Sequence, residues 1–174
     1  MAEKPSTQEK ERLISNCELF KPLSNERQLE LYDSFEWMTL DDGKEVIHEG
    51  EMADFLLVVV SGVLEVYKKG SGARQLLGFA REGTVLGEMG LISNERRYAS
   101  CRSIEQTLVG ILSYEKFDQI KVSNPYLYID LLTSLSKGMC RRLRSASDLV
   151  GNLKRRNEIA FKAAEQILEA VLDA

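Results

Sequence analysis

The spacing of hydrophobic positions changes twice along the chain and divides it into a helical start, a β-rich middle and a helical end. A capping box, S-T-Q-E at residues 6–9, predicts a short helix through about residue 16. A second helix is predicted over residues 25–33, with Leu29 and Tyr32 buried because they are spaced by three. From residue 35 onward, short β-prone runs alternate with glycine-bearing turns, which is typical of a β-sandwich or barrel, here of jelly-roll type.

The β-rich middle contains one run that is apolar on both faces. This run, residues 55–60, predicts a central and fully buried strand. The other predicted strands show mixed or alternating faces. The full set of predicted strands is 35–40, 45–48, 55–60, 63–67, 74–79, 98–104 and 107–112.

Helical spacing returns after residue 113. A short helix is predicted over 114–122, and Asn124 and Pro125 then provide a cap and a first helical residue for a long helix. Its narrow apolar seam predicts a long amphipathic helix, with a break near Gly151. The seam comprises Tyr128, Leu132, Leu135, Met139, Leu143, Ala146, Val150 and Leu153. The predicted segments are therefore 1–34 (helical), 35–122 (β-roll), 123–153 (long helix) and 154–174 (C-terminal helix).

Composition narrows the functional classes. The net charge is −4 and the pI about 5.2, which does not favour coating nucleic acid, and the longest apolar run has six residues, too few to span a membrane. The polar N-terminus is not a secretory signal, so a cytoplasmic location is expected. The three cysteines lack metal or redox spacing and His48 is the only histidine, so we expect free thiols, no metal and no hydrolytic or Cys-His enzyme.

The most informative segment for chemistry is residues 87–99, G-E-M-G-L-I-S-N-E-R-R-Y-A, between two predicted strands. Gly87 and Gly90 would let backbone N–H groups approach an anion, and Arg97 adds a guanidinium that fits phosphate oxygens. Glu88 suits a ligand that also has hydroxyl donors, such as a ribose. The same residues have an ordinary explanation, because Glu88 could favour a helix N-terminus and Arg97 could form a surface ion pair.

A resemblance to a known family favours the nucleotide interpretation. The chain resembles the cyclic nucleotide-binding domain family, whose phosphate-binding cassette reads G-E-x-[AG]-L, five residues, then R-x-A. Residues 87–91 are G-E-M-G-L, and residues 97–99 are R-Y-A. The segment 49–66 resembles the strand-turn-strand signature of the family, and N-P, R-R-L and V-G-N-L downstream resemble the long helix of its catabolite activator branch.

The resemblance implies a role for each cassette residue. Arg97 would pair with the cyclic phosphate and Glu88 would accept the ribose 2′-hydroxyl, while backbone amides complete the phosphate cradle. The long helix would close over the base, where Ala146 and Ser147 match a Thr-Ser pair of the catabolite activator branch. The implied ligand-binding residues are Gly87, Glu88, Met89, Gly90, Leu91, Arg97, Tyr98, Ala99 and Ser147.

Two residues depart from the family pattern. Ala146 lacks a hydroxyl, and Tyr98 replaces a small residue, so its ring could stack on the base, lie across the pocket or point away. The expected ligand is cAMP, with cGMP as the second possibility.

The expected partners follow from the helices. A homodimer through residues 125–153 is expected from the narrow seam, although the seam could instead pack on its own β-roll. A basic stretch over residues 137–156 is either a solvated helix face or a surface for an anionic partner. About twenty residues follow Leu153, too few for a helix-turn-helix module, so no direct DNA binding is expected.

We therefore expect a non-enzymatic sensor that passes ligand occupancy to an unknown downstream protein. The alternatives are a ligand-free interaction module of the same fold, or the sensor half of a truncated transcription regulator.

Overall fold

The computed structural model describes residues 4–70 and 73–172, with side chains as far as residue 159. The chain divides into two compact units, residues 1–135 and residues 136–174. The first unit contains the β-roll and its covering helices, and the second consists of the later part of helix α5.

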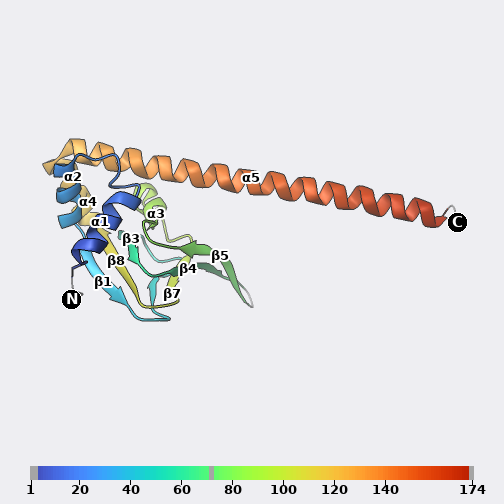
Figure 1. The fold of residues 1–174 in the computed structure, drawn as a ribbon, viewed down its shortest axis with the longest axis horizontal. Helices are drawn as coiled ribbons and strands as arrows, with labels where there is room; N and C mark the ends of the chain where they lie inside the picture. Colours follow the sequence, from blue (N-terminus) through green and yellow to red (C-terminus); the bar gives the residue numbers. More distant parts are fainter. Residues whose placement is uncertain (1–3, 71–72, 173–174) are drawn as a thin grey trace. The chain divides into compact units, whose positions relative to one another are not determined.

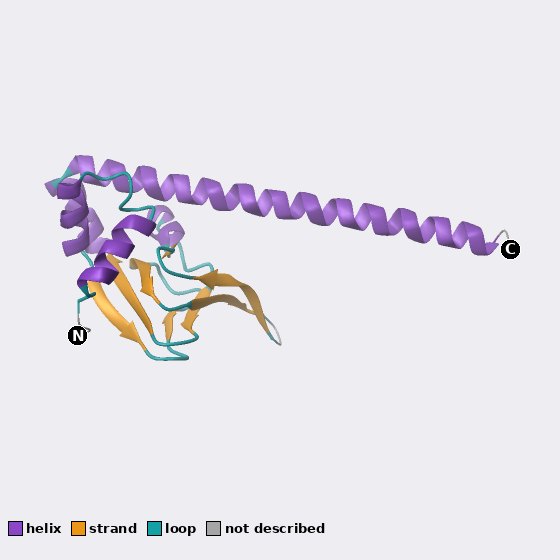
Figure 2. Cartoon of the chain, in the orientation of Figure 1, coloured by secondary structure: helices purple, strands orange, loops and turns teal. Residues whose placement is uncertain are grey.

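Two four-stranded antiparallel sheets form the centre of the first unit (Figure 2). One sheet has the order β1 (Glu36–Leu40), β8 (Thr107–Ser113), β3 (Phe55–Ser61) and β6 (Val85–Leu86). The other has the order β2 (Glu45–Ile47), β7 (Ser100–Ser103), β4 (Leu64–Lys69) and β5 (Arg74–Ala80). The predicted jelly-roll with flanking helices is confirmed.

Strand β3 lies between β8 and β6, as its apolar run predicts. Residues 56–60 are all at most 1% exposed, so the strand is buried on both faces. Leu57 and Val59 face the core between the two sheets, whereas Leu56, Val58 and Val60 face the core under the helices. The period-2 alternation of a strand thus connects two hydrophobic cores through one run of sequence.

Helices α1 (Thr7–Asn16), α2 (Asn25–Asp33) and α4 (Tyr114–Ser123) cover the sheet that contains β1, β8 and β3 (Figure 1). The predicted capping box is confirmed, because the Ser6 hydroxyl accepts from the Glu9 amide and the Glu9 side chain accepts from the Ser6 amide. The prediction that Leu29 is buried is wrong, since its side chain is 49% exposed and Leu31 is buried instead. Leu29 and Leu31 lie about 200° apart around a helix, so they cannot both face the core.

Helix α5 (Pro125–Leu172) begins as predicted, with the Asn124 side-chain oxygen accepting from the Leu127 amide at 3.1 Å. Its first turns belong to the first unit, where Leu127, Leu131 and Leu135 are buried. The predicted break at Gly151 is wrong, because α5 is one continuous helix and the two helices predicted at 123–153 and 154–174 are a single element. A helical glycine costs only about 1 kcal/mol relative to alanine, so one such residue does not end a long helix of otherwise favourable residues.

The other differences from the sequence predictions are small. Strand β6 has only two residues and was not predicted. The strand predicted from residue 98 starts at Ser100, so Tyr98 and Ala99 belong to the connection that enters β7. Both differences lie at the ends of the segment 87–99, where the chain leaves and re-enters the sheets.

Packing at Gly110 gives a first testable prediction. Gly110 pairs with Trp37 across β8 and β1, and a Cβ atom at Gly110 would lie 2.6 Å from the Trp37 ring. Gly110→Ala should therefore lower the free energy of unfolding by about 1–3 kcal/mol, measured by urea denaturation. Gly78→Ala is the matched control, because no atom lies within 4 Å of its added Cβ. Equal stability of the two variants would contradict this close packing of Gly110 on Trp37.

Candidate functional site

The segment 87–99 connects β6 to β7 and carries one short helix, α3 (Glu88–Ser93). Gly87 caps the helix in a left-handed conformation, with φ at 83°. Asn94 ends it in the same region of backbone space, with φ at 54°. Helix α3 is therefore bounded at both ends by residues of types that tolerate a positive φ.

The two glycines of the segment make room for specific neighbours. A Cβ at Gly87 would lie 2.5 Å from Arg97 Nη1, and a Cβ at Gly90 would lie 2.5 Å from the Ala53 Cβ. Gly87 is thus required both by its positive φ and by the approach of the guanidinium. Gly90 is required because α3 packs directly on the chain at Ala53.

Arg97 is the centre of this arrangement, and its side chain is only 4% exposed. Its main chain is held at both ends, with its amide donating to Glu51 O at 2.7 Å and its carbonyl accepting from the Gly50 amide at 2.9 Å. The guanidinium donates from Nη1 to Gly87 O at 3.3 Å. Its Cζ atom lies 4.4 Å from the centre of the Phe55 ring.

Asp54 supplies the counter-charge for Arg97 in the described structure. Arg97 Nη2 donates to Asp54 Oδ1 at 3.2 Å, and the Asp54 side chain is 77% exposed. Burial lowers the pKa of Arg97 from its ordinary value, and the Asp54 carboxylate opposes that shift. The site therefore holds a desolvated cation whose partner is mostly in solvent, an arrangement that an incoming anion could complete.

Glu88 lies in the first turn of α3 and is 2% exposed. The charges of Arg97 and Glu88 both affect the pKa of the buried Cys101 thiol, which lies in the following strand β7. Burial raises the pKa of Cys101 to about 12, Arg97 lowers it and Glu88 raises it. The Glu88 carboxylate and the Arg97 guanidinium, which sequence reasoning selected for ribose and phosphate, thus both act on the same buried thiol.

The remaining predicted residues occupy different environments. Leu91 is buried, and its amide donates to Gly87 O at 3.3 Å, so that amide is used within the segment. Met89 is 52% exposed and Ala99 is half-buried. Ser147, with Ala146 beside it, is an exposed residue of α5 in the second unit, and its predicted contact with a base stays a prediction.

Tyr98 is exposed and does not fill the core of the β-roll. Its side chain is 62% exposed, and Lys68 Nζ lies 3.8 Å from the centre of its ring. Side chains alternate between the two faces of a strand, so Lys68 lies on the same face of β4 as Leu64 and Val66. Leu64 and Val66 both contact the core between the sheets. The Lys68 ammonium also lies 3.9 Å from Glu49 Oε1.

Asp54, Phe55 and Lys68 were not predicted from the sequence as site residues. They come from β3, its approach and β4, and they are far from Arg97 or Tyr98 along the chain. The one signal in the sequence is a carboxylate, Asp54, immediately before the apolar run of β3. Many buried strands begin next to a charged residue, so this signal alone does not identify Asp54 as a site residue. Its pairing with Arg97 is visible only in the folded structure.

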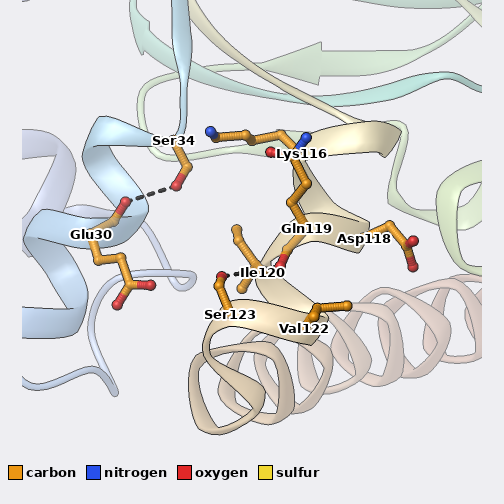
Figure 3. A pocket seen from close by; sticks show the side chains of 8 residues that line it. All are labelled: Glu30, Ser34, Lys116, Asp118, Gln119, Ile120, Val122 and Ser123. Atoms are coloured by element: carbon orange, nitrogen blue, oxygen red, sulfur yellow. Dashed lines mark hydrogen bonds between the residues drawn. The ribbon is translucent and has the colours of Figure 1, made fainter.

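A separate surface pocket lies away from this segment. Figure 3 shows it between α2 and α4, with Glu30 and Ser34 on one side and Lys116, Gln119 and Ser123 on the other. Two hydrogen bonds within single helices, Ser34 Oγ to Glu30 O and Ser123 Oγ to Gln119 O, fix its walls. Its lining mixes both signs of charge, with no single ligand chemistry evident.

Metal ligands and membrane-spanning helices are the two remaining features that would bear on function. Among the residues that the structure describes, no group of three or more His, Cys, Asp or Glu side chains is placed to hold a metal ion. Within the same residues, no helix combines the length and apolarity needed to cross a bilayer.

Comparisons with known proteins all match this chain to proteins that contain a cyclic nucleotide-binding domain. The family model described as the cyclic nucleotide-binding domain matches residues 37–124. The chain is 37% identical over 110 residues to the cAMP-activated global transcriptional regulator CRP of Salmonella typhimurium, an alignment that covers 62% of this chain and 50% of that protein. It is 35% identical over 107 residues to the cGMP-dependent protein kinase egl-4 of Caenorhabditis elegans, covering 62% of this chain and 13% of the kinase.

A solved structure supports the fold over a longer stretch. A cyclic nucleotide-binding domain from Methylobacillus flagellatus matches with a TM-score of 0.72 and 25% identity, covering 81% of this chain and 80% of that one. The chain spans about half the length of the transcriptional regulator and a smaller part of the kinase.

The burial of Arg97 gives a second prediction. Because the buried guanidinium is desolvated and its counter-charge is mostly in solvent, it should add little to stability without a ligand. Arg97→Met should change the free energy of unfolding by no more than about 1 kcal/mol, or increase it, in urea denaturation without nucleotide. Arg96→Met is the adjacent exposed control. A loss of more than about 3 kcal/mol would show that Arg97 is a structural residue first.

Proposed function

Because the chain belongs to the cyclic nucleotide-binding domain family, we propose that it is a non-enzymatic sensor whose preferred ligand is cAMP, with cGMP as the second candidate. The observation that carries the proposal is the buried guanidinium of Arg97, held by Gly87 and paired with a solvent-exposed Asp54. A cyclic phosphodiester would replace that carboxylate as the partner of Arg97, since both present oxygens to a fork of N–H donors.

Glu88 provides the second half of ligand recognition in this proposal. Its carboxylate would accept a hydrogen bond from the ribose 2′-hydroxyl, a role that suits a buried acceptor beside a cation. Amides of α3 and of the entry to β7, around Gly90 and Ala99, would complete the phosphate cradle, with Met89 and Leu91 shaping its edges. Leu91 would contribute its amide only if the bond to Gly87 O were exchanged.

Recognition of the base is proposed to involve Tyr98 and Ser147. Tyr98 is exposed, and the Lys68 ammonium lies over its ring, so the tyrosine is available to stack on a purine once the ammonium moves aside. Ser147 would supply one polar contact from α5, and Ala146 supplies none because it has no hydroxyl. cAMP is placed ahead of cGMP because the CRP of Salmonella typhimurium is described as cAMP-activated.

Signalling is proposed to follow a population shift. The ligand would favour one arrangement of α5 over another by its difference in affinity for the two, and a second copy of the chain would pair through residues 125–153. The downstream partner is an unidentified cytoplasmic protein. If the chain bound no nucleotide, the remaining functions would be a ligand-free interaction module or the sensor half of a longer transcription regulator.

Titration calorimetry tests the proposal directly. Wild-type protein should bind cAMP, and Arg97→Ala should weaken binding at least about 100-fold, because a charge-assisted pair to the phosphate is lost. Arg96→Ala is the matched control, since the Arg96 side chain is exposed and donates to Gly50 O; the affinity of this variant should stay within about threefold of wild type. Flat heats for wild type with both cyclic nucleotides, or equal affinities for wild type and Arg97→Ala, would reject the sensor function.

A further inference from the structure

Lys68 occupies a defined position beside the candidate site. Its ammonium nitrogen lies 3.8 Å from the centre of the Tyr98 ring and 3.9 Å from Glu49 Oε1. The Lys68 side chain is 32% exposed, a low value for a residue type that normally extends into water. Because Tyr98 directly follows Arg97, the ammonium is held next to the residue that adjoins the proposed phosphate contact.

Glu49, which holds the Lys68 ammonium, is itself fixed by the main chain. The Glu49 amide donates to Ser100 Oγ at 3.0 Å, and Ser100 is the first residue of β7. Glu49 Oε2 accepts from the Lys69 amide at 2.8 Å, at the end of β4. The carboxylate therefore connects two neighbouring strands, and its Oε1 atom faces the Lys68 ammonium from a fixed position.

The face of β4 that carries Lys68 belongs to the inside of the β-roll. Val66 lies on this face and contacts the core between the sheets, as does Cys101, its partner in β7. Arg97 lowers the pKa of the Cys101 thiol and Glu88 raises it. A ligand held by Arg97 and Glu88 would therefore lie on the side of this sheet from which Lys68 projects.

The ammonium occupies the place where a purine would stack on Tyr98. A cation over an aromatic ring is weakly bound at a partly exposed site, and a purine offers the ring a much larger contact. Stacking of a base on Tyr98 would therefore displace the ammonium from the ring face. Glu49 keeps the displaced ammonium nearby, so it would come to lie at the edge of the stacked base.

The two purines differ at that edge in a way that an ammonium can distinguish. A lysine ammonium has three N–H donors and no acceptor. Guanine presents two neighbouring acceptors, N7 and O6, whereas adenine presents N7 beside the donor amino group on C6. A group that can only donate is satisfied by both guanine atoms, but beside adenine it faces an amino group that cannot accept.

We propose that Lys68 is a specificity-determining residue, whose ammonium donates to O6 and N7 of a guanine stacked on Tyr98 and so raises the affinity for cGMP relative to cAMP. The proposal rests on the proposed function, because it requires a cyclic nucleotide bound at Arg97. It concerns the ratio of the two affinities, and it assigns part of that ratio to β4, outside the segment 87–99.

Titration calorimetry with both cyclic nucleotides tests the role of Lys68. In Lys68→Met, the ratio of cGMP affinity to cAMP affinity should fall about tenfold, because a charge-assisted hydrogen bond to guanine is lost. Lys68→Arg should keep the ratio within about threefold of wild type, since a guanidinium also donates to O6 and N7. Lys69→Met is the matched control and should keep the wild-type ratio, because the Lys69 side chain is 54% exposed and pairs with Glu45 Oε2 at 3.7 Å.

A third nucleotide identifies the atom that Lys68 contacts. Cyclic inosine monophosphate keeps the N7 and O6 acceptors of guanine but lacks its 2-amino group. Its affinity should fall about tenfold in Lys68→Met, as for cGMP, because the contact is made to O6. In a Tyr98→Leu background, Lys68→Met should change the cGMP to cAMP ratio by less than about threefold, because the base is no longer held against the ring.

The outcomes separate the role of Lys68 from ligand binding itself. Flat heats for wild type with all of these nucleotides would overturn the proposed function and the role of Lys68 together. Binding of cyclic nucleotides with the same affinity ratio in wild type and Lys68→Met would overturn the role of Lys68 alone. A loss of cGMP affinity without a matching loss for cyclic inosine monophosphate would also overturn it, since O6 would then not be the recognised atom.

Discussion

The structure of the candidate site depends on one interaction, the contact of the buried Arg97 guanidinium with the main chain at Gly87. A cation at 4% side-chain exposure is unfavourable in a β-roll unless nearby oxygens replace its water. The Gly87 carbonyl at 3.3 Å does so from one side, and Asp54 does so from the solvent side at 3.2 Å. The first partner is a fixed part of the fold, whereas the second is exposed and can be exchanged for another anion. That difference supports the proposed role of the guanidinium as the group that binds the phosphate of the ligand.

The same contact explains why the segment 87–99 departs from regular β structure. Gly87 must have a positive φ and no Cβ to admit Arg97, and Gly90 must have no Cβ to let α3 pack on Ala53. At both glycines a Cβ atom is excluded by a close neighbour, Arg97 in one case and Ala53 in the other. The short strand β6 and the start of β7 at Ser100 lie at the two ends of this segment, where the chain leaves one sheet and enters the other.

The jelly-roll, the capping box, the central strand and the two charged residues of the site can all be predicted from the sequence, since each leaves a local pattern. Residues 55–60 show their burial by composition alone, and Glu88 and Arg97 lie within one short motif. Asp54 and Lys68 cannot be predicted in this way, because their partners Arg97 and Tyr98 are adjacent only after β3 and β4 have paired with other strands.

The wrong expectations have local causes as well. Spacing from Tyr32 favours a buried Leu29, but the side of α2 that faces the core is set by Leu31. Gly151 favours a break in α5, but a single glycine does not outweigh the helical preference of the many residues around it.

Arg97 puts a strongly hydrogen-bonding group in the wall of a β-roll, where an apolar side chain would be at least as stable. A group of this kind is tolerated when specific partners satisfy it, so it favours selectivity over stability. In the proposed function, the exchangeable partner of Arg97 is the phosphate of the ligand. An apolar residue at this position is therefore expected to leave the free energy of unfolding nearly unchanged, or to raise it, while selectivity for that phosphate is lost.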